Sequence, residues 1–362
     1  MGKSVGIYLT SMTMGGAERV ALNLCSGLSK QGYDVDLVLV SATGKLLEEV
    51  PSSVSVVNLN AGRVASSIVP LRNYLSFQQP DVLYSMMTEP NIIALLARTL
   101  ASAETKLVIS EHNMLSRSSA SLKDQFVKFG AWALYPLADD VVAVSKGVQR
   151  DLVENTRLDT DAVTIIYNPV DIESIQGRGK EPVDHEWFTD ENTEVILSGG
   201  RHEPQKGFDT LLSGFTRMER SNTRLMLFGT GPETESLKQQ ATTLGIDNRV
   251  WFPGFVENPY KYMANADVFV LSSQYEGFGL VLIEALACGC PVVSTDCESG
   301  PAEILEDGKY GSLVPVGDYA ALVEAVKQCL DNSQNTEILR HRSEEFNIKS
   351  AIQEYMKIFE EI

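Results

Sequence analysis

Short apolar runs rich in β-branched residues alternate with longer amphipathic segments along the whole 362-residue chain. Such runs are typical of parallel strands buried on both faces, and the segments between them are typical of crossover helices. The pattern predicts strands in the first half at residues 5–9, 35–40, 54–59, 82–84, 107–110 and 141–144. It starts again in the second half, with strands at residues 195–198, 225–228, 250–252, 268–271, 292–294 and 312–314. The predicted fold class is therefore α/β, with two Rossmann-like domains.

A polar stretch with few apolar residues separates the two halves. It follows Asn168-Pro169-Val170-Asp171 and extends through Asn192, a composition typical of a linker. Two facing Rossmann-like domains place the carboxyl ends of both sheets on one cleft, where ligands bind in this architecture. We therefore expect a ligand cleft between the two domains.

Composition and charge argue against several classes of protein. The formal charge is -18, of which residues 1–170 carry a net -2 and residues 171–362 a net -16. So acidic a chain lacks the basic surface that general nucleic-acid binding requires. The five cysteines are irregularly spaced, which argues against a disulfide framework or a structural zinc site. No apolar stretch reaches the ~18 residues of a membrane-spanning helix, and we expect a cytoplasmic enzyme.

Glycine-rich turns follow the first predicted strand of each half. Gly15-Gly16-Ala17 precedes a helix, where glycines allow a ligand to approach closely and the helix N-terminus favours a phosphate. Gly199-Gly200-Arg201 is followed by Lys206-Gly207, so an Arg and a Lys five residues apart can reach one diphosphate. The alternatives are an ordinary structural turn and two solvated surface cations.

Two further motifs follow later strands. Glu276 and Glu284 bracket a glycine turn and the start of an apolar helix, where a carboxylate needs hydrogen-bond donors such as sugar or ribose hydroxyl groups. His112 follows Ser110-Glu111 at the carboxyl end of a predicted strand, a position that favours a functional role. The alternatives are an ordinary loop glutamate, a helix-packing glutamate and a structural histidine.

Together these motifs resemble those of the retaining, nucleotide-sugar-dependent glycosyltransferases of family 4, which have the GT-B fold. The resemblance covers nearly the whole chain and extends through Asn168-Pro169-Val170-Asp171, Phe228-Gly229-Thr230-Gly231-Pro232 and Ala287-Cys288-Gly289-Cys290-Pro291-Val292. It implies an acceptor-binding domain at residues 1–172 and a nucleotide-sugar-binding domain at residues 173–346. It also implies a C-terminal helix at residues 347–362 that packs back on the first domain.

The resemblance further implies a role for each motif residue. Arg201 and Lys206 hold the donor diphosphate and stabilise its charge as it leaves. Glu276 binds the transferred sugar, Glu284 binds the ribose, and His112 lies against the sugar and the acceptor. The remaining implied donor-binding positions are Gly16, Gly200, Gly229, Val256, Gly277, Phe278, Gly279 and Leu280.

The implied activity is transfer of a hexose or N-acetylhexosamine from a nucleotide sugar to a glycan or a polyprenyl-linked acceptor, in the synthesis of cell-surface polysaccharide or glycoconjugates. UDP as the nucleotide, like retention of configuration, rests on the resemblance alone. The alternatives are transfer to a soluble small molecule, a sugar-nucleotide epimerase and a non-catalytic sugar-nucleotide binder.

No cofactor is implied, and the sequence favours a metal-independent enzyme. Asp34-Val35-Asp36 and Asp159-Thr160-Asp161 match a triplet that holds a metal ion in a different glycosyltransferase fold. The first triplet opens an apolar strand and the second lies in a polar loop, so we interpret both as structural. Arg201 and Lys206 already supply positive charge for a diphosphate.

Residues 114–138 combine basic and aromatic side chains in an otherwise acidic chain. Arg117, Lys123 and Lys128 lie among the aromatic residues, and an amphipathic basic stretch suits the surface of an anionic membrane. The alternative is a helix that packs on its own sheet with a solvated rim. With the family resemblance, the stretch favours peripheral association with the inner face of the plasma membrane, close to a lipid-linked acceptor.

Overall fold

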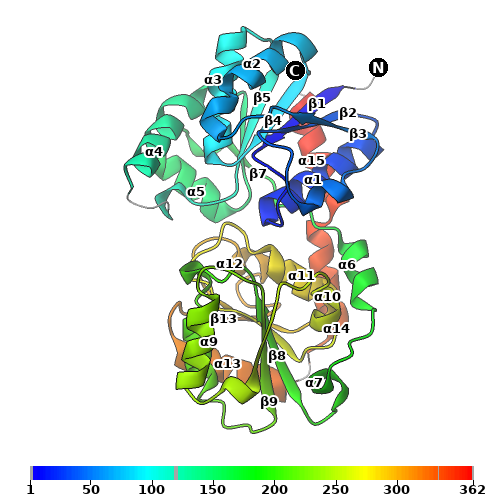
Figure 1. Ribbon diagram of the computed structural model, residues 1–362, viewed down its shortest axis with the longest axis vertical. Helices are drawn as coiled ribbons and strands as arrows, with labels where there is room; N and C mark the ends of the chain where they lie inside the picture. Colours follow the sequence, from blue (N-terminus) through cyan, green and yellow to red (C-terminus); the bar gives the residue numbers. More distant parts are fainter. Residues whose placement is uncertain (1–2, 118–120, 333, 361–362) are drawn as a thin grey trace. The chain divides into compact units, whose positions relative to one another are not determined.

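The structure, a computed structural model, describes residues 3–117, 121–332 and 334–360 (Figure 1). The chain divides into two compact units. The first unit combines Met1–Val170 with Phe346–Ile362, and the second unit is Asp171–Glu345. The sequence analysis places these divisions after residues 172 and 346.

The first unit contains a sheet in which every described strand pair is parallel, in the order β3-β2-β1-β4-β5-β6-β7. Its strands are β1 (Ser4–Leu9), β2 (Asp34–Leu39), β3 (Val54–Asn58), β4 (Val82–Met86), β5 (Lys106–Glu111), β6 (Asp140–Ala143) and β7 (Val163–Ile165). Its α-helices are α1 (Gly16–Lys30), α2 (Ile68–Gln78), α3 (Thr88–Ala101), α4 (Leu122–Leu134), α5 (Lys146–Asn155) and α15 (Ile348–Glu360). Short 3-10 turns connect these elements, of which η4 (Tyr135–Leu137) follows α4 directly.

The second unit repeats the architecture with a parallel sheet in the order β10-β9-β8-β11-β12-β13. Its strands are β8 (Glu194–Gly199), β9 (Thr223–Phe228), β10 (Val250–Gly254), β11 (Val268–Leu271), β12 (Val292–Thr295) and β13 (Ser312–Val314). Its α-helices are α6 (Ile172–Gly179), α7 (Glu186–Thr189), α8 (Phe208–Phe215), α9 (Thr234–Thr243), α10 (Tyr260–Met263), α11 (Leu280–Cys288), α12 (Pro301–Ile304), α13 (Tyr319–Asp331) and α14 (Thr336–Ser343).

The strand order places a topological switch at the centre of each sheet. In the first unit the order reverses between β1 and β4, and in the second unit it reverses between β8 and β11. Strands β1, β4 and β5 are buried along almost their whole length, so helices cover both faces of the sheet. In open sheets of this kind, ligands bind beyond the carboxyl ends of the strands at the switch point.

The last helix of the chain belongs to the first unit. Helix α15 packs against α1, where Gly27 makes room for Ile352: a Cβ atom at Gly27 would lie 2.5 Å from Ile352 Cγ1. The hydroxyl groups of Tyr84 in β4 and Tyr355 in α15 are 2.8 Å apart and fully buried. These contacts close the hydrophobic core of the first unit.

Membrane crossing requires a helix that is both long and strongly apolar. None of the helices in the described part of the chain meets that requirement. All five cysteines are buried free thiols.

Candidate functional site

The loops after β8, β9 and β10 lie side by side at the carboxyl edge of the second sheet. The backbone N–H of Gly200 donates to Phe228 O at 3.1 Å, and the N–H of Gly229 donates to Gly254 O at 2.8 Å. Gly229 has a φ of 113°, and a Cβ atom there would lie 1.8 Å from Gly200 O. The close approach of these loops therefore requires glycine at position 229.

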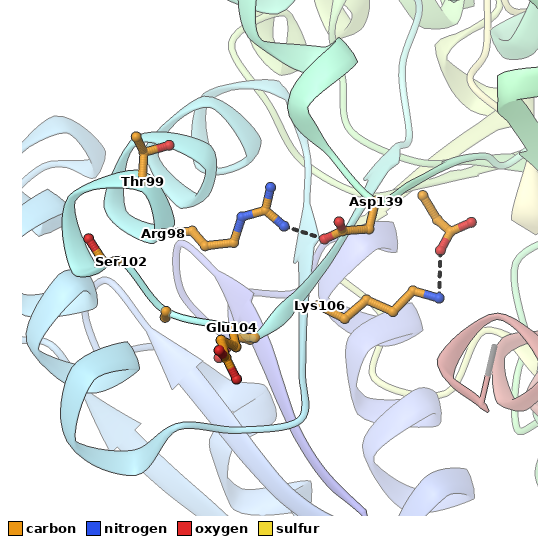
Figure 2. A pocket seen from close by; sticks show the side chains of 9 residues that line it. Arg98, Thr99, Ser102, Glu104, Lys106 and Asp139 are labelled. Carbon is orange, nitrogen blue, oxygen red and sulfur yellow. Dashed lines mark hydrogen bonds and ion pairs between the residues drawn. The ribbon is translucent and has the colours of Figure 1, made fainter. Parts of the chain in front are cut away.

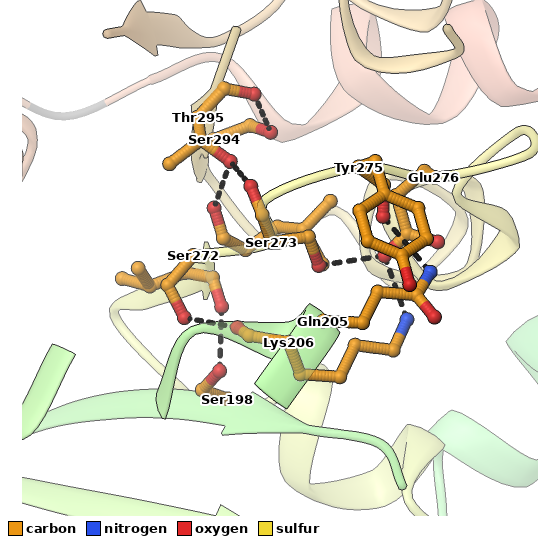
Figure 3. A network of polar contacts seen from close by, with 11 residues as sticks. Ser198, Gln205, Lys206, Ser272, Ser273, Tyr275, Glu276, Ser294 and Thr295 are labelled. Atoms are coloured by element: carbon orange, nitrogen blue, oxygen red, sulfur yellow. Dashed lines mark hydrogen bonds and ion pairs between the residues drawn. The ribbon is translucent and has the colours of Figure 1, made fainter. Parts of the chain in front are cut away.

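Lys206 and Glu276 form an ion pair at this edge, although 70 residues separate them along the chain. Lys206 Nζ donates to Glu276 Oε1 at 2.6 Å, and the Ser273 hydroxyl donates to the same oxygen at 2.6 Å (Figure 3). The side chains of Lys206 and Glu276 are 19% and 8% exposed. A buried carboxylate is tolerated where a cation and a hydroxyl group compensate its charge.

Main-chain and side-chain hydrogen bonds hold the β8 loop against the β11 loop. Ser272 Oγ donates to Lys206 O at 2.8 Å, and Gln205 Nε2 donates to Tyr275 O at 2.9 Å (Figure 3). The N–H of Gln274 donates to Gln205 O at 2.7 Å. The position of Lys206 is therefore fixed by its backbone as well as by its ion pair.

Arg201 lies on the same loop in a more open environment. Its side chain is 65% exposed, and its Nη1 is 3.3 Å from Glu203 Oε1. A surface ion pair of this kind contributes at most about 1 kcal/mol. The guanidinium group is therefore held only weakly and can turn towards an incoming anion.

The segment from Gly277 to Leu280 leads from Glu276 into α11. Gly279 is the N-cap of α11 with a φ of 96°, and Ser299 Oγ donates to Gly277 O at 2.6 Å. The start of α11 supplies a partial positive charge next to the Lys206–Glu276 pair. Further along α11, Glu284 accepts a hydrogen bond from the Tyr260 hydroxyl at 3.4 Å.

Sequence analysis missed the hydroxyl residues that support this network. Ser273 follows the end of β11, and Thr295 at the end of β12 donates to Ser273 O at 2.6 Å (Figure 3). The feature that could have indicated these residues is the clustering of Ser and Thr at the carboxyl ends of two adjacent predicted strands.

Of the predicted site residues, Gly16 and His112 belong to the first unit, while all the donor-loop residues discussed above belong to the second. Gly16 opens α1 after β1, and His112 follows β5, so both lie at the carboxyl edge of the first sheet. His112 is 8% exposed, and its Nε2 is 3.0 Å from Ser110 Oγ. Burial lowers the pKa of His112 to about 4, so its ring is neutral near pH 7.

The basic stretch forms α4, whose apolar side chains are largely exposed. Leu122 and Phe126 are each 75% exposed and Phe129 is 64% exposed, whereas Ala131 is buried and Gly130 lies against Ile92 of α3. Lys123 pairs with Glu89 at 2.6 Å, and Lys128 Nζ donates to Ser116 O at 3.4 Å. Arg117 is exposed, and residues 118–120 of this stretch lie outside the described residues.

The first Asp triplet opens β2, and the second lies at the start of η5 (Thr160–Ala162). Asp36 accepts a hydrogen bond from the Tyr74 hydroxyl at 2.8 Å, and burial raises its pKa. Across the described residues, no group of three or more His, Cys, Asp and Glu side chains is arranged to hold a metal ion.

Figure 2 shows a surface pocket in the first unit. It lies at the amino ends of β5 and β6, whereas His112 follows the carboxyl end of β5. Its lining includes Lys106 and Asp140, the first residues of β5 and β6, which pair at 2.9 Å. Arg98 pairs with Asp139 in the same pocket. Because its charges compensate one another and it lies at the amino ends of the strands, we do not assign the donor site to it.

Known proteins are similar to this chain over most of its length. The model of "Glycosyltransferase Family 4" matches residues 14–174, and that of "Glycosyl transferases group 1" matches residues 180–349. The N-acetylgalactosamine-N,N'-diacetylbacillosaminyl-diphospho-undecaprenol 4-alpha-N-acetylgalactosaminyltransferase of Campylobacter jejuni is 31% identical over 349 residues, which are 92% of this chain and 91% of that protein. The lipopolysaccharide 1,6-galactosyltransferase of Escherichia coli K12 is 25% identical, over 85% of this chain and 84% of that protein.

The fold matches solved glycosyltransferases of the GT-B type. The crystal structure of Anabaena Alr3699/HepE in complex with UDP and glucose superposes with a TM-score of 0.82 at 22% identity, over 99% of both chains. The two parallel α/β sheets and these matches define the molecule as a glycosyltransferase with the GT-B fold. The chain belongs to glycosyltransferase family 4.

Proposed function

We propose that the enzyme transfers a hexose or N-acetylhexosamine from a UDP-sugar, with retention of configuration, to a polyprenyl-linked or other glycan acceptor in cell-surface polysaccharide synthesis. The observation that carries this proposal is the Lys206–Glu276 pair, set beside Arg201 and the start of α11 at the switch point of the second sheet. Cations and helix N–H groups together suit a diphosphate, and a buried carboxylate suits sugar hydroxyl groups.

In this proposal Lys206 and Arg201 bind the donor diphosphate from two directions. Glu276 orients Lys206 before the donor arrives, and then accepts hydrogen bonds from the transferred sugar. Glu284 binds the ribose, while the glycine loops at Gly200 and Gly229 let the nucleotide approach the main chain. Leaving-group stabilisation by fixed charges is the main catalytic contribution.

Retention follows without a protein nucleophile. The bond from the anomeric carbon to the diphosphate oxygen breaks through an oxocarbenium-like state, and a bond to the acceptor oxygen forms on the same face. The proton of the acceptor hydroxyl passes to the departing diphosphate, so that UDP is released. His112, whose ring is neutral near pH 7, hydrogen-bonds the sugar and the acceptor.

The comparisons support the substrate classes in this proposal. The Anabaena structure holds UDP and glucose, and the Campylobacter relative is named for an undecaprenol diphosphate-linked acceptor. A polyprenyl acceptor requires a membrane, and we propose that α4 brings the enzyme to the anionic inner face of the plasma membrane. Arg117, Lys123 and Lys128 supply positive charge, and the exposed aromatic residues insert between the lipids.

The donor is tested by thermal shift with UDP-glucose, UDP-galactose, UDP-GlcNAc, UDP-GalNAc and GDP-mannose, followed by assays of UDP release. We expect at least one UDP-sugar to raise the melting temperature and to be hydrolysed slowly, and an acceptor reaction to give an α-linked product from the α-linked donor. Failure of every UDP-sugar in both assays would refute the proposal. Conversion to an epimeric UDP-sugar would support the epimerase alternative instead.

Metal independence is tested on the same reaction. Since Arg201, Lys206 and the start of α11 neutralise the diphosphate, we propose that the rate of UDP release is unchanged after dialysis against EDTA. Loss of the rate, with recovery on adding Mn²⁺, would contradict this.

A further inference from the structure

Glu111, the last residue of β5, is a buried carboxyl group to which the chemistry above gives no role. It is 1% exposed, and its Oε2 accepts a hydrogen bond from Thr88 Oγ1 at 3.0 Å. Its Oε1 accepts one from Asn91 Nδ2 at 3.2 Å and one from the Tyr135 hydroxyl. All three donors are neutral, and a carboxylate buried among neutral groups is costly, which is why such groups are rarely kept without a purpose.

The three donors come from two different helical elements. Thr88 and Asn91 lie in the first turn of α3, and Tyr135 begins η4 directly after α4. Asn91 Nδ2 also donates to Ser110 O at 2.9 Å. The end of β5 is therefore tied through one carboxyl group to the start of α3 and to the end of α4.

The alternation of side chains along β5 links the hydrogen bonds of Glu111 to the position of His112, the predicted site residue. Successive side chains of a strand point to opposite faces, so Glu111 lies on one face while Ser110 and His112 share the other. Ser110 Oγ and His112 Nε2 are 3.0 Å apart on that face. Any rotation of the strand end that moves Glu111 also turns His112.

We propose that Glu111 is a positioning residue for glycosyl transfer: its ionised carboxylate holds the end of β5 against α3 and the end of α4, and so orients His112. This inference rests on the proposed role of His112. It assigns to the network the placing of His112 against the transferred sugar, whereas the Lys206–Glu276 pair serves the diphosphate.

The protonation state of Glu111 decides which hydrogen bonds hold the end of β5 to α3 and to the end of α4. An ionised carboxylate accepts from all three donors at once, whereas a protonated one has a hydroxyl group that needs an acceptor. Asn91 Oδ1 is buried without a hydrogen-bond partner, and turning the Asn91 amide would offer it to that hydroxyl group at the expense of the bond to Ser110 O. In that arrangement Asn91 still contacts Glu111, but Ser110 O loses its hydrogen bond from α3, so protonation weakens the hold of α3 on the strand end.

The charged and titratable groups around Glu111 place this change near neutral pH. Burial is the main cause that raises the pKa of Glu111 to about 7, and the charge of Asp151 in α5 adds to it. Tyr135 stays neutral because burial raises its pKa, and His112 stays neutral because burial lowers its pKa to about 4. The residues of α3 in the network, Thr88 and Asn91, are uncharged. Of these groups, Glu111 is the one that changes its charge between pH 6 and 8.

The test compares full-length wild type with Glu111→Gln, using UDP release from the best donor of the panel above. The glutamine has the size of glutamate but cannot ionise. We expect the wild-type kcat to rise about tenfold from pH 6 to 8 with a midpoint near 7. In Glu111→Gln we expect kcat to stay near the wild-type value at pH 6 throughout, with KM for the donor changed less than twofold. Glu111→Asp, which is one methylene too short for all three donors, is expected to restore the inflection only in part.

Asp36→Asn is the matched control, because Asp36 is also a carboxyl group bonded to a tyrosine, lies in the same unit, and has a pKa raised by burial. It lies within β2, away from the carboxyl edge of the sheet, and we expect it to keep the wild-type pH profile. A Glu111→Gln enzyme that keeps the inflection near pH 7, at whatever rate, would show that the residue is merely structural and would overturn the proposal.

A second readout does not depend on activity. In histidine-labelled protein, the ring resonances of His112, assigned with His112→Gln, are followed by NMR from pH 6 to 8. We expect a shift with a midpoint near 7 in the wild type that is absent in Glu111→Gln. If the wild type released no UDP but this shift behaved as expected, the proposed function would fail while the coupling of Glu111 to His112 stood. A wild-type shift that persisted in Glu111→Gln would overturn the coupling.

Discussion

Lys206 is held by the carboxylate of Glu276, and in the proposed function a bound diphosphate competes with that carboxylate for the same ammonium group. The 2.6 Å contact with Glu276 keeps the cation near the carboxyl edge of the sheet before any donor arrives. Ser273 donates to the same Glu276 oxygen, so in the proposed function this hydroxyl group compensates the carboxylate when the cation turns towards phosphate. The pair therefore prepares the site without filling it.

Lys206→Ala is expected to lower kcat for UDP release about 100-fold. Loss of one preorganised charge at a leaving group costs about 3 kcal/mol of barrier, by comparison with the loss of a single oxyanion-hole donor. The matched control is Lys238→Ala in α9, whose ammonium group pairs with Glu235 at the surface of the same unit. A Lys206→Ala enzyme within threefold of the wild-type rate would remove Lys206 from the catalytic machinery.

Gly229→Ala is expected to destabilise the second unit by about 3 kcal/mol, because the new Cβ atom would meet Gly200 O and the φ of 113° strains any other residue. Gly245→Ala is the control. It has a φ of 69° but open space around the added Cβ atom, and should cost about 1 kcal/mol. Thermal unfolding of the two variants separates the cost of the steric clash with Gly200 O from the cost of a positive φ alone. Equal losses of stability would mean that the close approach of the loops is unimportant.

The sequence shows which residue types form the site, but it does not show which of these residues contact each other. Arg201, Lys206 and Glu276 stand out because charged residues flank glycines after apolar strands. The contact between Lys206 and Glu276 depends on β8 and β11 being neighbours, and the alternation of strands and helices leaves that order open. The hydrogen-bond network of Glu111 was not predicted, because its three donors come from segments 20 to 24 residues away in the chain.

At the scale of elements, the strands were predictable because each core strand is a continuous apolar run, and the predicted α/β class is confirmed. Strand β7 was not predicted, although β13, which is equally short and also lies at a sheet edge, was. The four-residue helices α7, α10 and α12 were not predicted, and neither were the longer helices α2, α6 and α14. Helix α4 was predicted, but its exposed aromatic face could not be, because sequence periodicity does not tell which side of a helix meets solvent.

Changing both Phe126 and Phe129 to Glu is expected to abolish pelleting of the enzyme with anionic liposomes. These rings are 75% and 64% exposed, and their burial among lipids would supply much of the binding free energy. Phe77→Glu is the control, since Phe77 is 83% exposed on α2 of the same unit. The fraction of protein that sediments at low salt is the measurement. If Phe77→Glu lost binding while the double variant kept it, the docking face would have to be placed on α2 instead.

At the scale of the whole molecule, the first unit is built from both ends of the chain. Ile352→Asp in α15 is expected to destabilise that unit by about 4 kcal/mol, because it buries an unpaired charge against α1. The control is Ile338→Asp in α14 of the second unit, where the side chain is 52% exposed and little change is expected. Calorimetry distinguishes the two variants. An unchanged transition in Ile352→Asp would mean that α15 contributes little to the first unit.

The position of α15 has a consequence for how the protein is made. Synthesis runs from the N-terminus, and domains generally fold as units while the chain emerges from the ribosome. Residues 171–345 are continuous and can fold as soon as they are free. The first unit, although most of it is translated earlier, must wait with part of its apolar surface uncovered until residues 348–360 arrive. The half of the enzyme that is made first is thus the half that is finished last, and during that interval it is the part most exposed to aggregation and to chaperones.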